Sequence, residues 1–246
     1  MNTLPYDKNW LKLNFDHLIK NKLDGVTGKT IYLANNFVEK IIRASTYGKA
    51  GLTTIPGSIF SKEVIMKVGK FNSSSRAGED TDWLQRLYFY NFNIKISNSP
   101  LFYKGLYNTD YITIVKKWFR NYYLSSELPH LNNQKNFYYL CIFIILFLLV
   151  FNWNYSSLCL NNTLCVNDRS DIYIPHITKI FLTVSFLSYA IFRGIIIPFK
   201  KEIKIKYLFP YRFIFITFFS FILDLVKSIT FLTLIFLKFF YLPRKR

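Results

Sequence analysis

Three carboxylates are crowded into the stretch GEDTDW, residues 78–83, of a chain that is otherwise strongly basic. Glu79 and Asp80 are adjacent, and Asp82 follows two positions later. Acidic side chains in the first turn of a helix complement its dipole, with Asp80 or Thr81 as the expected N-cap. A carboxylate can also act as a general base that takes the proton of an attacking hydroxyl group. The two interpretations are compatible, because a residue at a helix N-terminus can also face a pocket.

The residues that follow the cluster have the spacing of a helix. Trp83, Leu84 and Leu87 recur at helical intervals and are expected to form one buried face. Asp82 and Arg86 are four positions apart, so they are expected to pair on the surface of the same helix in a structural role.

Helix and strand patterns alternate around this segment, which predicts an α/β domain over residues 1–128. Residues 48–60 are expected to form a loop that leads to a short strand. Ser61 is the expected N-cap of the next helix, and Gly69 its end. The other elements are expected at residues 30–45 (a short strand, then a helix), 92–97 (a strand) and 110–128 (an amphipathic helix).

Residues 129–246 consist mostly of apolar blocks, in a chain that is 51% hydrophobic and 20% aromatic. This composition exceeds that of an ordinary soluble domain. It predicts an α-helical membrane region of two to four segments, at about residues 136–153, 177–199 and 211–241. The third is long for one upright span and short for two, so a tilted helix, a re-entrant pair and a partly interfacial helix stay open. The basic ending PRKR favours the re-entrant or double-pass form.

Charged residues interrupt two of the apolar blocks. Arg193 lies near one end of its block, from which its long side chain could reach the membrane interface. Asp224 and Lys227 are three positions apart on one helical face and are expected to pair. A small transporter could use such charges, but about three spans without a repeat do not favour that function.

The net charge of +18 arises from 32 Lys+Arg against 14 Asp+Glu. The basic residues are mostly Lys, flank the apolar blocks and form no nucleic-acid reading motif, so the expected partner is a membrane surface and not nucleic acid. Residues 154–176 contain only Arg169 as a Lys or Arg, which places the N-terminal part in the cytoplasm. Cys159 and Cys165 would then lie outside, where a disulfide is possible, whereas Cys141 is an expected buried thiol. No Cys/His spacing predicts a metal site.

The order of motifs around the acidic cluster resembles the C-terminal half of the family 2 glycosyltransferases, which are inverting enzymes of GT-A fold. The resemblance is good over residues 55–96 and looser over 24–54. Many membrane-bound members have a cytoplasmic catalytic domain followed by C-terminal spans, as expected here. The residues that carry it are Gly57 and Ser58, the helix SKEVIMKVGKF at 61–71, the stretch GEDTDW, and Leu84, Arg86 and Leu87 before a strand.

The resemblance implies a catalytic role for two of the acids. Asp80 matches the general base, which takes the proton of the acceptor hydroxyl as it attacks the anomeric carbon of a sugar nucleotide. Glu79 adds a second negative charge beside it and so favours proton uptake by Asp80.

The resemblance also implies substrate-binding residues. Gly57 and Ser58 correspond to the small-residue stretch, and Trp83 either shapes the acceptor pocket or lies in the core. The segment KKWFRNYY, residues 116–123, loosely resembles the Gln-x-x-Arg-Trp region of processive members, although it also reads as an interfacial helix. Its Arg120 would lie near a diphosphate leaving group or a lipid-phosphate acceptor.

Two family patterns do not occur ahead of the acidic cluster: an opening strand like VSVIIPTYN, and an Asp-x-Asp that binds a divalent metal and the nucleotide diphosphate. Asp80-Thr81-Asp82 has that spacing but lies in a different element. The expected domain is therefore a partial GT-A-like (Rossmann-like) domain without its nucleotide-binding half, from a truncated or split gene or with a second chain supplying that half. The resemblance implies Mg or Mn, but this sequence lacks the motif that binds it.

These patterns together predict a membrane-bound glycosyltransferase of the bacterial inner membrane. It would transfer a sugar from a nucleotide-sugar donor to a lipid-linked or polysaccharide acceptor. The alternative is a non-catalytic membrane protein, either a remnant or the partner subunit of a glycosyltransferase.

Overall fold

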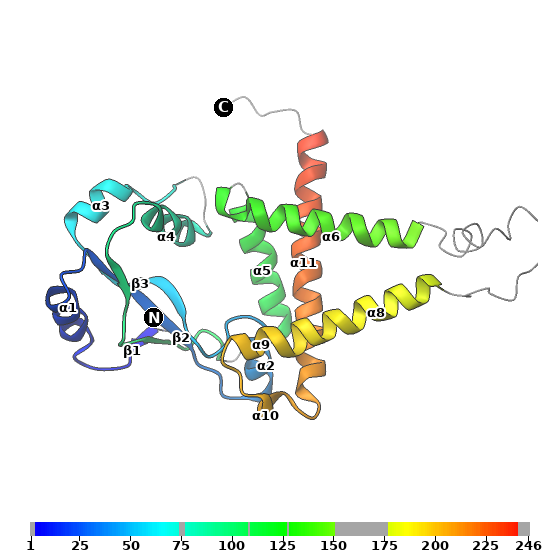
Figure 1. Cartoon of the computed structure of the whole chain (residues 1–246), viewed down its shortest axis with the longest axis horizontal. Coiled ribbons are helices and arrows are strands. Elements are labelled where there is room, and N and C mark those ends of the chain that lie inside the picture. Colours follow the sequence, from blue (N-terminus) through cyan, green and yellow to red (C-terminus); the bar gives the residue numbers. More distant parts are fainter. Residues whose placement is uncertain (1–2, 74–76, 108, 127, 151–176, 241–246) are drawn as a thin grey trace, which may run out of the picture.

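The computed structural model describes residues 3–73, 77–107, 109–126, 128–150 and 177–240 of the chain. A mixed sheet with surrounding helices is followed by a helical region, which confirms the predicted class of an α/β domain followed by helices (Figure 1). The first region contains β1 (Thr3–Pro5), α1 (Trp10–Lys20), β2 (Gly25–Tyr32), α2 (Phe37–Ser45), β3 (Leu52–Phe60), α3 (Lys62–Val68), α4 (Glu79–Phe89), β4 (Ile94–Ile96), β5 (Leu101–Tyr103) and α5 (Tyr111–Ser125). The second contains the 3-10 turn η1 (Pro129–Leu131), α6 (Asn132–Val150), α8 (Ile177–Ile191), the π-helical turn η2 (Phe192–Ile196), α9 (Ile197–Lys200), α10 (Ile205–Leu208) and α11 (Arg212–Phe240).

Strand β2 is the centre of the sheet. It pairs with β3 antiparallel on one side and with β4 and then β5 in parallel on the other, while β1 pairs antiparallel with β5. Among the described strands β3 therefore forms one edge of the sheet. The pairing of β2 with β3 shifts register between Val26 and Gly28. This irregularity lets one long strand run through Pro56 and Gly57, so the prediction of a loop before a short strand is wrong for residues 52–60.

Local signals set the ends of the two helices around the acidic cluster. The Oγ atom of Ser61 accepts a hydrogen bond from the backbone of Val64, and Gly69, with φ of 81°, follows α3, so both predicted ends are confirmed. Helix α4 begins at Glu79 after Gly78, which has φ of 80° and no side chain to cap with. The prediction that Asp80 or Thr81 is the N-cap is wrong, because the left-handed Gly78 starts the helix earlier.

Helix α4 is held against the sheet by a small core. Trp83, Leu84 and Leu87 are buried as predicted, and they pack with Val64 and Val68 of α3. This core fixes the buried face of α4. The acids at the N-terminus of α4 lie at positions of the first turn that are outside this core.

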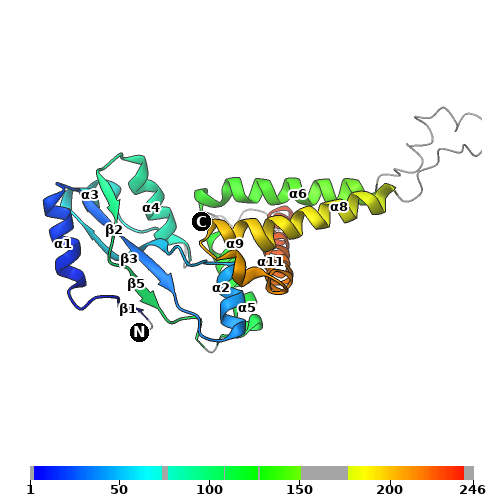
Figure 2. The same cartoon turned by 60° about the horizontal axis from the view of Figure 1, so that its bottom comes forward.

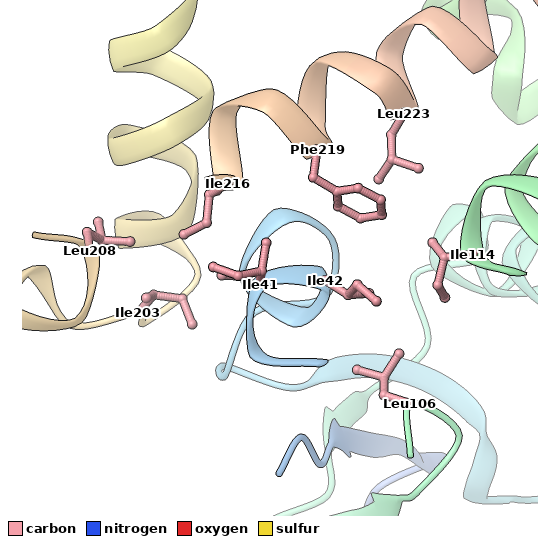
Figure 3. Packing of buried hydrophobic residues seen from close by; sticks show 10 residues of the cluster. Ile41, Ile42, Leu106, Ile114, Ile203, Leu208, Ile216, Phe219 and Leu223 are labelled. Carbon is pink, nitrogen blue, oxygen red and sulfur yellow. The ribbon is translucent and has the colours of Figure 1, made fainter. Parts of the chain in front are cut away.

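A second core joins the α/β region to the later helices. Figure 3 shows Ile41 and Ile42 of α2 facing Ile216 and Phe219 of α11, with Ile114 of α5 to one side. Because this cluster contains residues from both sides of position 128, α2 and α5 are anchored to the apolar helices and not only to the sheet.

Within the described residues, two helical stretches are long and apolar enough to cross a membrane: Ile180–Lys200, which joins α8, η2 and α9, and Arg212–Phe236 of α11. The first predicted segment, 136–153, begins within α6, and its residues 151–153 lie outside the described residues, as do Cys159 and Cys165. The third segment is one helix over 212–240, so its interpretation as a re-entrant or double-pass pair is wrong.

The three apolar helices are not parallel. Helices α6 and α8 lie side by side and extend away from the sheet, whereas α11 crosses both at a steep angle (Figures 1 and 2). In the most apolar part of Ile180–Lys200 only 6% of the residues are buried, whereas 39% are buried in the most apolar part of Arg212–Phe236. Helix α11 is therefore the more covered of the two, because α2 and α5 pack along it.

An ion cluster ties these helices together at Asp224 of α11. Arg193 contacts it at 2.8 Å and Lys227 at 3.2 Å, so the predicted pairing of Asp224 with Lys227 is confirmed. Tyr138 of α6 and Tyr189 of α8 donate hydrogen bonds to the same carboxylate at 2.7 and 2.9 Å. Arg193, expected at the membrane interface, thus has a partner within the protein, because the largely covered Asp224 carboxylate lies at close range.

Candidate functional site

A pocket of about 400 Å³ lies between the N-terminus of α4 and helix α5. Asp80 and Thr81 of α4 face it from one side, and Trp118 and Tyr122 of α5 from the other. Its lining residues are Tyr47, Ala77, Gly78, Asp80, Thr81, Trp118, Asn121, Tyr122, Ser125 and Leu131. A carboxylate and several aromatic rings thus meet at the point where the sheet region joins the apolar helices.

The three acids of α4 lie in different surroundings. Asp80 is half-buried, lines the pocket, and its Oδ1 atom accepts a hydrogen bond from the backbone of Thr81 at 2.8 Å. Glu79 lies beside it, and its Oε2 atom is buried without a hydrogen-bond partner within the described part of the chain. Of these acids only Asp80 is available to a molecule in the pocket.

Asp82 has the structural role predicted for it. Its carboxylate contacts Arg86 at 3.2 Å, four positions later on the same helix. Arg86 also donates hydrogen bonds to the backbone oxygens of Val68 at 2.7 Å and Lys70 at 2.9 Å. The pair therefore ties α4 to the end of α3 and leaves Asp82 committed to the fold.

The structure places Trp83 in the core. Its side chain is 3% exposed, its indole N–H donates to the backbone oxygen of Gly69 at 2.8 Å, and its ring packs against Phe60. Trp83 supports the position of α4, and it does not line the pocket.

The remaining residues implied by the resemblance lie outside the pocket lining. Gly57 adopts φ of 78°, and a Cβ atom there would approach Leu101 to 2.6 Å. The Oγ atom of Ser58 accepts from the backbone of Gly28 at 2.7 Å, so both residues shape the irregular pairing of β2 and β3. Arg120 is exposed on α5 beside the pocket residue Asn121, with a long contact of 3.5 Å to that side chain.

An aromatic wall of Tyr47, Trp118 and Tyr122 completes the pocket. The sequence singled out residues 116–123 with Arg120 as their candidate, but it gave these three rings no individual role. Tyr47 stacks on Tyr32 with ring centroids 3.7 Å apart, and Trp118 lies 5.6 Å from Tyr122. Burial raises the pKa of Tyr32, and the charge of Asp80 contributes to that rise. Burial also raises the pKa of Tyr47 and brings that of Tyr122 to about 12. The phenols of Tyr47 and Tyr122, which line the pocket, are neutral near pH 7 and can donate hydrogen bonds to a bound hydroxyl group.

The wall continues into the ion cluster of α11. The Lys227 ammonium lies 4.9 Å from the ring of Trp118 and 5.4 Å from that of Tyr122. A cation close to aromatic rings is held by their quadrupoles. The orientation of Trp118 and Tyr122 therefore depends on Lys227 of α11, which lies more than 90 positions later in the sequence.

The described residues do not fit a resident metal. No group of three or more His, Cys, Asp or Glu side chains comes together within the described part of the chain. Asp82, which has the Asp-x-Asp spacing with Asp80, is paired with Arg86. The chemistry considered below accordingly uses no metal ligand of this chain.

Comparison of the chain with protein family models, with curated proteins and with solved structures gave no match.

Proposed function

We propose that this chain is the acceptor side and membrane part of a glycosyltransferase of family 2 type, with a partial GT-A-like domain. One observation supports the proposal most directly. Asp80, the residue that the motif pattern matches to a general base, lies in an aromatic-walled pocket at the junction with the apolar helices. An acceptor with a lipid anchor could reach this position without leaving the membrane surface.

The proposed reaction uses Asp80 as the base. An acceptor hydroxyl oxygen attacks the anomeric carbon of the donor sugar and forms the new glycosidic bond. The bond from that carbon to the diphosphate oxygen breaks, and the nucleoside diphosphate leaves with the electron pair. The hydroxyl proton passes to the Asp80 carboxylate, so charge and atoms balance. The flat faces of Trp118 and Tyr122 supply apolar contact area for the acceptor.

Donor binding is assigned to a second chain in this proposal. No Asp-x-Asp occurs ahead of Asp80 in the sequence, and the described acids do not form a metal-binding group. The nucleotide-sugar would then be presented to the pocket from outside this chain, with Asp80 contributing only the base.

For the membrane arrangement we propose that α6 and α8 cross the bilayer while α11 lies along its surface. The exposed faces of α6 and α8 are apolar and lie away from the sheet (Figure 2). Helix α11 runs across them and carries α2 and α5 on its covered side. The Lys-rich segments flanking α6 and α8 favour a cytoplasmic α/β region.

The test is an Asp80→Asn substitution in the full chain, placed at the native locus of the source organism so that any partner chain is present. Transfer of radiolabelled sugar from a panel of nucleotide-sugars into lipid and polymer fractions of isolated membranes is measured. We expect a loss of at least about 100-fold, because the variant cannot take the acceptor proton.

Glu63→Gln is the matched control, since it removes the same charge from an exposed position on α3. Its transfer rate should equal that of the wild type. Unchanged transfer by Asp80→Asn would refute the catalytic assignment. If deletion of the whole chain left every transfer reaction intact, the chain would instead be a non-catalytic membrane protein.

A further inference from the structure

A second pocket, of about 420 Å³, lies where α2 meets the corner between α9 and α11. Its lining shares no residue with the pocket of Asp80. Four of its lining residues are cationic and none is acidic, and a tyrosine and two apolar residues complete it. They are Phe37, Lys40, Arg43, Lys49, Ile203, Tyr207 and Arg212.

None of the four cations has an ion-pair partner among the described residues, although the structure shows ion pairs for other residues. Like charges gathered in a concave site repel one another, and the low-dielectric wall strengthens that repulsion. The arrangement is therefore complementary to an anion.

Unused hydrogen-bond groups point to the same kind of ligand. Arg43 and Arg212 each donate one terminal N–H to a backbone oxygen, of Tyr32 at 3.2 Å and of Tyr207 at 3.3 Å. Their Nε atoms and the Tyr207 hydroxyl are buried without a partner among the described residues. Buried polar groups are normally satisfied, and guanidinium groups match the oxygens of phosphate well. The Arg212 guanidinium also lies 4.6 Å from the Tyr207 ring, which holds it at the pocket.

The pocket lies at the level where the apolar stretches end. Ile180–Lys200 ends at Lys200 and Arg212–Phe236 begins at Arg212, and the residues between them supply Ile203 and Tyr207 to the lining. Figure 3 shows Ile203 and Leu208 next to Ile216 and Ile41, so this corner packs firmly on α2. At such a boundary the phosphates of lipid head groups are the most abundant anions.

We propose that this cationic pocket binds a phosphate group, and that its position favours the phosphate of a membrane lipid over a soluble one. The proposal does not depend on the base role of Asp80, because the two pockets are separate. It assigns a ligand-binding function to Lys40, Arg43 and Lys49, which lie within ten positions of one another, and to Arg212, which lies more than 160 positions later.

Calorimetric titration of the full chain in detergent tests the proposal with three probes. Dioctanoyl phosphatidic acid carries the lipid phosphate, pyrophosphate is its soluble counterpart, and dioctanoylglycerol is the lipid without phosphate. The test variant is Lys40→Gln/Lys49→Gln, because neither ammonium group makes a hydrogen bond within the described residues and the fold should be kept. We expect it to bind phosphatidic acid about tenfold more weakly, as for the loss of charged hydrogen bonds.

Two further variants separate the pocket from general charge. Lys12→Gln/Lys62→Gln removes the same charge from exposed positions on α1 and α3 and should leave the affinity unchanged. Lys40→Arg/Lys49→Arg keeps the charge and should keep the binding. Tighter binding of phosphatidic acid than of pyrophosphate would support the lipid source. The reverse order with the same dependence on Lys40 and Lys49 would support the phosphate site and refute the lipid source.

Two results would overturn the proposal. In the first, Lys40→Gln/Lys49→Gln and Lys12→Gln/Lys62→Gln change the affinity for phosphatidic acid and pyrophosphate by the same factor, or neither variant changes it. The other is binding of dioctanoylglycerol as tight as that of phosphatidic acid, because the site would then recognise the acyl chains and not the phosphate.

Discussion

Three acids within four positions of α4 have acquired three separate environments. Asp82 forms an ion pair with Arg86, Glu79 is partly buried, and Asp80 faces the pocket. The helix determines this division, because successive residues point in directions about 100° apart. Crowding in the sequence therefore does not become crowding in one site.

Arg86 provides the test at this scale. Its removal breaks the contact with Asp82 and leaves the backbone oxygens of Val68 and Lys70 without this donor. We expect Arg86→Met to lower the free energy of unfolding by about 1–3 kcal/mol, as for the loss of charged hydrogen bonds at a partly exposed site. Urea unfolding followed by far-UV circular dichroism measures it.

Gln85→Met is the control for Arg86→Met, because Gln85 is exposed on the same helix and Met is an equally good helix former. Its stability should stay within about 0.5 kcal/mol of the wild type. If Arg86→Met behaved like this control, the pair with Asp82 would be a surface contact without structural weight.

At the scale of elements, α11 organises the apolar half through Asp224. Hydrogen bonds from Tyr138 of α6 and Tyr189 of α8, together with Arg193 of η2, converge on one carboxylate. Such a polar cluster in apolar surroundings specifies which helix faces meet, because any other register leaves charged groups unpaired. The steep crossing of α11 over α6 and α8 is held at this point (Figure 1).

Asp224→Asn tests that role. The substitution keeps the shape but leaves Arg193 and the 7% exposed Lys227 without their anion. We expect a loss of about 3–5 kcal/mol, the usual cost of leaving a buried charge uncompensated. It is measured as a fall in the thermal midpoint of the purified chain in detergent.

A triple variant completes this test. Arg193→Met/Asp224→Leu/Lys227→Met removes all three charges together, and we expect it to recover most of the lost stability. If Asp224→Asn unfolded at the wild-type temperature, water or lipid head groups would be balancing the cations and the cluster would not hold the helices.

The sequence predicted the elements whose signals are local. Ser61, Gly69 and the Asp82–Arg86 pair depend on neighbours within a few positions, and all three were predicted correctly. The length of β3 was not, because Pro56 and Gly57 are typical of a loop and only the pairing with β2 makes them part of a strand.

Contacts between distant segments explain the rest of the misses. Tyr47, Asp80 and Trp118 meet in one pocket although more than 30 positions separate each from the next. The sequence suggested Asp80 through its motif and residues 116–123 through a loose resemblance, but it offered no signal for Tyr47. The pairing of Arg193 with Asp224 was missed for the same reason, because the two residues lie 31 positions apart.

For the whole molecule, the shared core of α2, α5 and α11 makes the α/β region and the apolar helices one structure. A boundary at residue 128 separates them in sequence composition, yet buried residues from both sides pack together. The Asp80 pocket and the cationic pocket both lie at this junction, so substitutions in α11 are expected to affect sites on the α/β region.

The membrane arrangement gives the prediction at this scale. If α6 and α8 cross and α11 lies along the surface, the C-terminus and the α/β region are on the same side. We expect a green fluorescent protein fused after Arg246 to fluoresce and an alkaline phosphatase at that place to be inactive. Phosphatase inserted within residues 154–176 should be active, and an active C-terminal phosphatase would show instead that α11 crosses.

The position of strand β3 at the edge of the sheet affects how the protein can be produced. Among the described strands it pairs only with β2, so its outer side offers main-chain groups that an added strand can use, interrupted by Pro56, which has no N–H to donate. A proline in an edge strand discourages self-association without closing the edge to a matching segment. Production of this chain alone should therefore yield a smaller fraction of soluble, non-aggregated protein than co-expression with a partner that extends the sheet. The first strand of such a partner would pair with β3.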